Sequence, residues 1–165
     1  MKAFNRNAAK SIYKKVCYKK GIVTVEFLDN DANVIKVTGA EMPHPDFRIA
    51  MNRLKNDGYL KMILGVDDTC ILTPQAIEIP VVGTVVLRGT IDTNYGEIEF
   101  KTSPIKMAEH KDDALWEMFN VVEEITNEAD LYIFQGKTAQ ASIPFELKHD
   151  GADGARALLS MTGTN

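Results

Sequence analysis

One order of predicted elements occurs twice in this sequence, and it restricts the fold more than any other feature. In each copy a hairpin of β-branched residues is followed by a helix and then by one or two strands. The polar turns of the two hairpins, at Asp29 and Asp92, lie 63 residues apart, and the two helix starts lie 67 residues apart. We therefore predict an internal duplication of a ββαββ unit, with copies at residues 21–81 and 82–147.

The duplication also predicts how the elements pack. The first helix is followed by a predicted strand over residues 59–64. The second helix is expected to end near Asn127, before a strand over 130–136 and its hairpin partner over 139–147. A single helix covers the sheet of its own unit poorly, so two units would bury their apolar faces together. The predicted fold class is α+β, a two-layer domain over residues 21–147 in which two helices cover antiparallel sheet.

Charge divides the chain into a basic arm, an acidic body and a polar tail. Residues 1–20 carry seven basic and no acidic side chains, whereas the rest of the chain has a net charge of −11. Apolar residues recur every four positions from Phe4 to Val16, which predicts a short amphipathic helix in the arm. Residues 148–165 are small, polar and rich in glycine, which predicts a flexible tail.

The basic arm is the predicted nucleic-acid-binding site. Lysine and arginine side chains bind phosphate groups, and the interleaved Phe4, Tyr13 and Tyr18 can stack on bases. Two alternatives stay open: the basic side chains form a solvated helix face, or they neutralise the acidic body of a neighbouring subunit. The predicted nucleic-acid-binding residues are Lys2, Arg6, Lys10, Lys14, Lys15, Lys19 and Lys20.

The second predicted helix carries an acidic stripe beside the only tryptophan of the chain. Carboxylates at spacings of four, seven and four residues form one continuous face of a helix. Such a face is either simply solvated, or it meets a basic protein surface or mimics phosphate. The tryptophan is either an interface anchor or is buried under the tail. The predicted partner-binding residues are Asp113, Trp116, Glu117, Glu124 and Glu128.

A calcium site at the first hairpin turn is not supported by the spacing of its side chains. Asp29, Asp31 and Asn33 alternate as the first ligands of a calcium loop do. Position 6 of such a loop needs glycine and position 12 needs glutamate, but Val34 and Ala40 stand there. We interpret the stretch as a polar hairpin turn.

The sequence contains no motif that points to an enzyme. His44, His110 and Cys70 are the candidate catalytic residues, but no zinc-site spacing, nucleophile motif or phosphate-binding glycine loop accompanies them. Glu97 and Glu99 alternate on a predicted strand, so both carboxylates are expected to face water. We therefore predict no catalytic residues, no metal and no cofactor.

The four strands between the two predicted helices resemble the spacing in DNA sliding clamps, which are built from repeated β-α-β-β-β units. One clamp domain of two such units is similar in length to residues 21–147. The resemblance is one of topology and size, without a shared motif, and it implies an oligomeric accessory factor of nucleic-acid metabolism. Clamps line their DNA channel with basic helices. Here the first helix is basic, with Arg48, Arg53 and Lys55, and the second is acidic.

These features predict a non-enzymatic binding protein. The leading hypothesis is a clamp-like accessory factor that contacts nucleic acid through its arm. The alternative is a protein–protein interaction or assembly protein, either a structural subunit or an inhibitor that presents its acidic helix, in which the arm docks on a neighbouring subunit. No apolar run approaches the roughly 20 residues of a membrane span. The two cysteines form no CxxC pair, so a cytoplasmic, reducing setting is expected.

Overall fold

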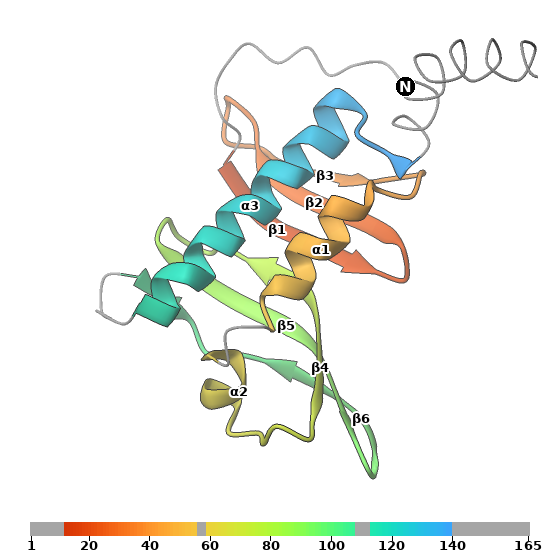
Figure 1. Ribbon diagram of the computed structural model, residues 1–165. Coiled ribbons are helices and arrows are strands. Elements are labelled where there is room, and N and C mark those ends of the chain that lie inside the picture. Colours follow the sequence, from red (N-terminus) through yellow and green to blue (C-terminus); the bar gives the residue numbers. More distant parts are fainter. Residues whose placement is uncertain (1–11, 56–58, 108–112, 140–165) are drawn as a thin grey trace, which may run out of the picture.

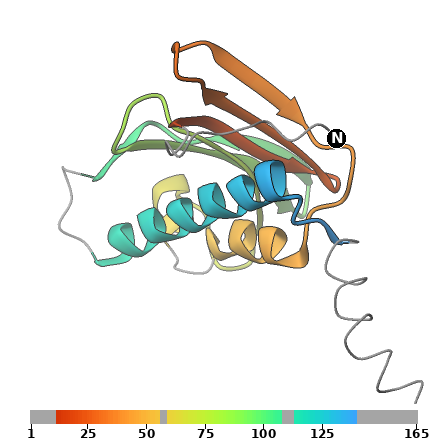
Figure 2. The same ribbon diagram turned by 90° about the horizontal axis from the view of Figure 1, so that it is seen from above.

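The computed structural model describes residues 12–55, 59–107 and 113–139 (Figure 1). Its elements, in chain order, are β1 (Ile12–Lys19), β2 (Ile22–Leu28), β3 (Val34–Thr38), α1 (Pro45–Arg53), α2 (Tyr59–Leu64), β4 (Ile71–Glu78), β5 (Thr84–Thr93), β6 (Gly96–Lys101), β7 (Ile105–Lys106) and α3 (Asp113–Gln135). The strands form one antiparallel sheet in the order β3-β2-β1-β4-β5-β6, and β7 pairs with β5. Figure 2 shows α1 and α3 side by side on one face of this sheet, so the predicted α+β, two-layer fold class is confirmed.

Alternation along the strands separates an apolar face from a polar one. In β2, Val23, Val25 and Phe27 point toward the helices and are buried, as expected for a strand with one covered face. The opposite face carries ion pairs between neighbouring strands. Among these, Glu78 of β4 lies 3.5 Å from Lys15 of β1. The helices therefore cover only one face of the sheet in the described part of the chain.

The core lies between the sheet and the two longer helices. One stripe of α3 supplies apolar side chains at helical spacing, namely Leu115, Met118, Val122, Ile125 and Ala129. Phe47 of α1 packs beside Tyr132 of α3, with ring centroids 6.4 Å apart. At the same end of α3, Phe134 meets Phe27 of β2 edge to face, with ring centroids 5.6 Å apart. Such aromatic contacts add to the burial energy of the rings and fix how α3 lies on the sheet.

The first hairpin turn confirms the interpretation of its aspartates. The carboxylate of Asp29 accepts hydrogen bonds from the backbone N–H groups of Asp31 and Asn33, at 2.9 and 2.8 Å. The side-chain amide of Asn33 also donates to Oδ2 of Asp29, at 3.0 Å, and this bond, together with the two backbone bonds, lowers the pKa of Asp29 because it stabilises the charged form. The turn therefore joins β2 to β3 through the side chain of its own first residue.

The predicted helix over residues 4–16 is wrong for residues 12–16, which belong to strand β1 (Ile12–Lys19). The spacing of four between Ile12 and Val16 suggested one helix face, but Ile12 is 52% exposed whereas Val16 is buried. A bulge between Tyr13 and Lys15 brings Tyr13 and Val16, three residues apart, to the inner face of the strand. One inserted residue can thus imitate helical spacing. Residues 1–11 lie outside the described part of the chain.

Two predicted strands are also wrong. Residues 59–64 form the short helix α2, which buries Tyr59 and Leu60. Residues 130–135 continue α3 beyond Asn127, because Ala129 and Tyr132 extend its buried stripe. The helix ends at Gly136, whose φ of +67° is the left-handed conformation that closes helices. Residues 140–147 of the predicted final strand and the predicted tail lie outside the described residues.

The internal duplication stays a prediction, and the described elements include two runs of the same kind. Each run consists of three antiparallel strands followed by a helix, β1–β3 with α1 and β4–β6 with α3. The two first strands, β1 and β4, pair at the centre, so that the strand order is symmetric about them. The predicted boundaries at residues 21 and 82 fall in the turns after β1 and after β4. None of the described helices is long and apolar enough to cross a membrane.

Candidate functional site

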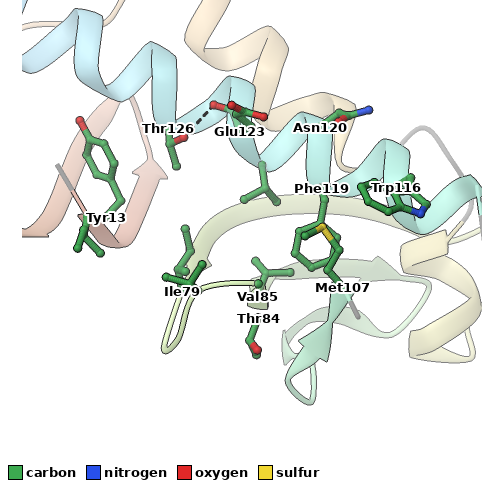
Figure 3. Close-up of a pocket in the computed structure, with 14 residues that line it drawn as sticks. Tyr13, Ile79, Thr84, Val85, Met107, Trp116, Phe119, Asn120, Glu123 and Thr126 are labelled. Carbon is green, nitrogen blue, oxygen red and sulfur yellow. Dashed lines mark hydrogen bonds between the residues drawn. The ribbon is translucent and has the colours of Figure 1, made fainter. Parts of the chain in front are cut away.

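An apolar groove lies between α3 and the strand ends below it (Figure 3). Its volume is about 520 Å³. The first half of α3 forms one wall, and the other consists of the turn between β4 and β5, the start of β5 and Met107, which follows β7. The lining residues are Ile12, Tyr13, Ile79, Val82, Gly83, Thr84, Val85, Met107, Trp116, Phe119, Asn120, Val122, Glu123 and Thr126.

The wall on α3 comes from a second face of that helix. Trp116, Phe119, Glu123 and Thr126 follow one another at spacings of three or four residues, and Asn120 lies four residues after Trp116, so they share one side of the helix. This side adjoins the stripe that fills the core. Figure 3 shows Phe119 beside Met107 and Val85, with Trp116 at the outer end of the row. Trp116 is 52% exposed, which is high for the largest apolar side chain of the chain.

The opposite wall is an apolar turn. Residues 79–83 join β4 to β5, and within them Val81 is 62% and Val82 is 89% exposed. Turns of this kind are usually made of polar residues and glycine. The backbone holds the turn in place, since Ile79 donates to the carbonyl of Lys14 at 2.8 Å and Thr84 donates to that of Val81 at 3.1 Å. Both valines are therefore exposed to solvent, and Val82 lines the groove.

The inner end of the groove is closed by a buried tyrosine. Tyr13 is 5% exposed, and its hydroxyl donates to Oδ1 of Asp130 at 2.8 Å. Nearby, the hydroxyl of Thr126 donates to the carbonyl of Glu123 at 2.8 Å, one turn back along α3. Because these hydroxyls bond within the protein, the groove presents mainly carbon to a ligand.

Of the five predicted partner-binding residues, Trp116 lines this groove, and Asp113 and Glu117 lie near it on α3 without lining it. Asp113, Trp116 and Glu117 are exposed in the first turn and a half of α3, and Trp116 lines the cavity. Glu124 and Glu128 are engaged within the protein. Glu124 pairs with Arg53 of α1, and Glu128 lies 2.9 Å from Nζ of Lys137. The acidic stripe is therefore divided: its first half borders the groove, and its second half holds α1 and the end of α3 together.

The ammonium of Lys137 is the centre of this second half. It lies 2.8 Å from Asp46 and 2.9 Å from Glu128. Burial alone would lower the pKa of Lys137, but the hydrogen bonds to the two carboxylates outweigh it and raise that pKa. The same contact lowers the pKa of Asp46 below its ordinary value of 3.8. The contribution of Asp46 to the free energy of unfolding is therefore fully present above pH 4. It is lost as the pH falls through the lowered pKa of Asp46.

We expect Lys137→Met to lower the free energy of unfolding by about 1 kcal/mol at pH 7, because it leaves Asp46 and Glu128 without their shared cation. The loss should shrink below pH 4, where Asp46 protonates, and at alkaline pH, where Lys137 itself loses its proton. Urea unfolding at pH 3, 7 and 11 measures it. Lys101→Met, at an exposed position on β6, is the control and should change little. An equal loss in both variants would contradict a role for the network.

The predicted nucleic-acid-binding residues are spread along the first strand. Lys14 donates to the carbonyl of Pro80 at 3.2 Å, and Lys15 lies 3.5 Å from Glu78. Lys19 and Lys20 are exposed at the turn between β1 and β2. The remaining three, Lys2, Arg6 and Lys10, lie outside the described residues. Of the four described lysines, two are thus held by the sheet and two face solvent.

Two of the three candidate catalytic residues, His44 and Cys70, lie in the described part of the chain. The ring of His44 caps α1, where its Nδ1 accepts from the backbone N–H of Asp46 at 3.3 Å. Cys70 is half-buried against the core, and His110 lies outside the described residues. Glu97 and Glu99 are exposed on β6, as predicted. Within residues 12–55, 59–107 and 113–139, no three metal-ligating side chains of the His, Cys, Asp and Glu types form a group.

The β4–β5 wall of the groove was missed at the level of sequence, although the signal is present. The stretch from Ile79 to Gly83 joins two strands and contains no polar side chain. An apolar turn between strands indicates a contact surface. Met107 had no such signal, because β7 is only two residues long and its pairing with β5 depends on the folded sheet.

Comparison with protein-family models, with curated proteins and with solved structures gives no match. The resemblance to sliding clamps therefore stays a hypothesis, and the function has to follow from the groove and the charges beside it.

Proposed function

We propose that this chain is a non-enzymatic interaction protein that holds an apolar segment of a protein partner in the groove between α3 and the β4–β5 turn. The observation that carries the proposal is the pair Trp116 and Val82, exposed on the two walls of one apolar cavity. Contiguous exposed apolar surface rimmed by polar side chains marks interaction sites in folded proteins.

The size and composition of the groove suit a ligand. Its volume of about 520 Å³ falls within the roughly 300–1,000 Å³ range of ligand-binding pockets. Covering a large apolar side chain such as Trp116 or Val82 is worth about 1.5–3 kcal/mol. Tryptophan is also among the residues that most often dominate the energy of interfaces. The groove thus has an anchor on each wall.

The shape of the groove favours a stretch of polypeptide. From Trp116 to Thr126 the wall follows ten residues of α3, about 15 Å at 1.5 Å per residue. An extended peptide of about five residues covers that distance. Asp113 and Glu117 flank Trp116 on the helix and are exposed. The segment that fits best is therefore apolar with basic side chains at the end near Trp116, since rim charges of opposite sign favour association.

The experiment is a titration of the full chain with the neutral apolar dye N-phenyl-1-naphthylamine, followed through dye emission. We expect saturable binding of one dye per chain and a loss of about tenfold or more in affinity for Val82→Asp, because a charge then lies in the apolar wall. The matched control is Val34→Asp, at an exposed valine on the edge strand β3. Unsaturable binding, or equal effects of both variants, would count against the groove.

The nucleic-acid hypothesis remains a prediction, and its strongest described feature is the exposed pair Lys19 and Lys20. Adding labelled single-stranded DNA and RNA to the same titration at two salt concentrations separates the two functions. Tight binding that weakens steeply with salt would favour the nucleic-acid function. A dye affinity that stays the same when either oligonucleotide is added would favour the protein-binding groove.

A further inference from the structure

We infer that residues 1–11 of the same chain occupy the groove when no partner is bound, so that a partner must displace them. This inference rests on the proposed function, since it names a built-in competitor for the same site. It has three supports: where the segment joins the fold, how far it reaches and what chemistry it carries.

The segment joins the described fold at the groove itself. Ile12, the first described residue, lines the cavity and is 52% exposed, and the next residue, Tyr13, closes its inner end. The polypeptide that precedes Ile12 therefore starts at the wall of the groove. A segment tethered at this point has an effective concentration of about millimolar at the site, so even a weak contact is populated.

The length of the segment matches the groove. Phe4 lies eight positions before Ile12, and an extended chain of eight residue steps spans roughly 26 Å. The wall on α3 runs about 15 Å from the inner end, at Thr126, to its outer end at Trp116. Phe4 can therefore reach Trp116 with several residues to spare.

The chemistry of the segment complements the site. Phe4 is its only aromatic residue, and its charged side chains are Lys2, Arg6 and Lys10, with no acidic residue among them. The exposed carboxylates of Asp113 and Glu117 lie on either side of Trp116 along α3. A cationic segment with one aromatic anchor is the kind of ligand that an apolar groove with an acidic rim selects.

The test compares Phe4→Ala with the matched control Asn5→Ala in the full chain. Removing the anchor is expected to raise the affinity for N-phenyl-1-naphthylamine by about threefold to tenfold, because the dye no longer competes with a tethered aromatic side chain. Acrylamide quenching of Trp116, the only tryptophan, should rise in parallel. Asn5→Ala should change neither quantity.

Unchanged dye affinity and quenching in Phe4→Ala would overturn the inference, while the groove would stand if Val82→Asp still weakens the dye. Absence of saturable dye binding in every form would instead overturn the proposed function. Light scattering at two protein concentrations completes the test. A dimer that Phe4→Ala dissociates would show that the segment binds a second copy, which also overturns the assignment to the same chain.

Discussion

Trp116→Ala is expected to weaken dye or partner binding by about thirtyfold, the equivalent of roughly 2 kcal/mol, without unfolding the protein. Trp116 forms the outer end of the groove and is half exposed, so its removal takes away contact area for the ligand and little of the core. The expected change in the free energy of unfolding is about 0.5 kcal/mol or less. Dye titration measures the first quantity, and urea unfolding measures the second.

The matched control is Tyr95→Ala. Tyr95 is fully exposed at the turn between β5 and β6 and takes no part in the groove. Its removal should leave the affinity unchanged. If Trp116→Ala and Tyr95→Ala behaved alike, the groove would be an ordinary apolar depression on the surface and the proposed function would be wrong.

Gly89→Ala is expected to lower the free energy of unfolding by about 3 kcal/mol and the melting temperature by about 6–12 °C. A Cβ at Gly89 would lie 2.2 Å from the carbonyl oxygen of Thr73 and 2.9 Å from the ring of Phe100. The oxygen belongs to the backbone of the neighbouring strand, so β4 and β5 would have to separate. Calorimetry of the variant measures the loss.

Thr73→Ala is the control for this prediction, because it changes an exposed side chain on the same stretch of β4. It should cost about 0.5 kcal/mol. A similar small cost for Gly89→Ala would show that the two strands approach one another less closely than the structure places them. The region lies far along β5 from Val85, so the groove should keep its affinity for the dye in both variants.

The sequence predicts the fold class because alternation and helical stripes dominate its longer elements. Val23, Val25 and Phe27 specify a strand with one covered face, and the acidic stripe specifies one side of α3. Short elements depend on tertiary contacts. The six residues from Tyr59 to Leu64 are apolar enough for a strand or a buried helix. They form a helix, which buries Tyr59 and Leu60 in the core.

Of the candidate site, the sequence predicts Trp116 and its acidic neighbours but not the groove. A groove has two walls, and the wall opposite α3 comes from a turn around Val82, 34 residues before Trp116 in the chain. Periodicity describes one element at a time and carries no information on which turn faces which helix. The ion pair of Glu124 has the same origin, since Arg53 lies beside it only when α1 packs on α3. Lys137 reaches Glu128 because the chain turns back after the end of α3.

The short seam between β1 and β4 gives the groove a mechanical role. The two three-strand halves share a ladder only where Lys15–Cys17 pairs with Ala76–Glu78. The groove takes Ile12 and Tyr13 from the first half, and the β4–β5 turn from the second. A bound segment would therefore contact both halves at once and connect them across the β1–β4 pairing. We therefore expect binding in the groove to stabilise the pairing of β1 with β4. Amide hydrogens of these two strands should then exchange more slowly when the groove is filled.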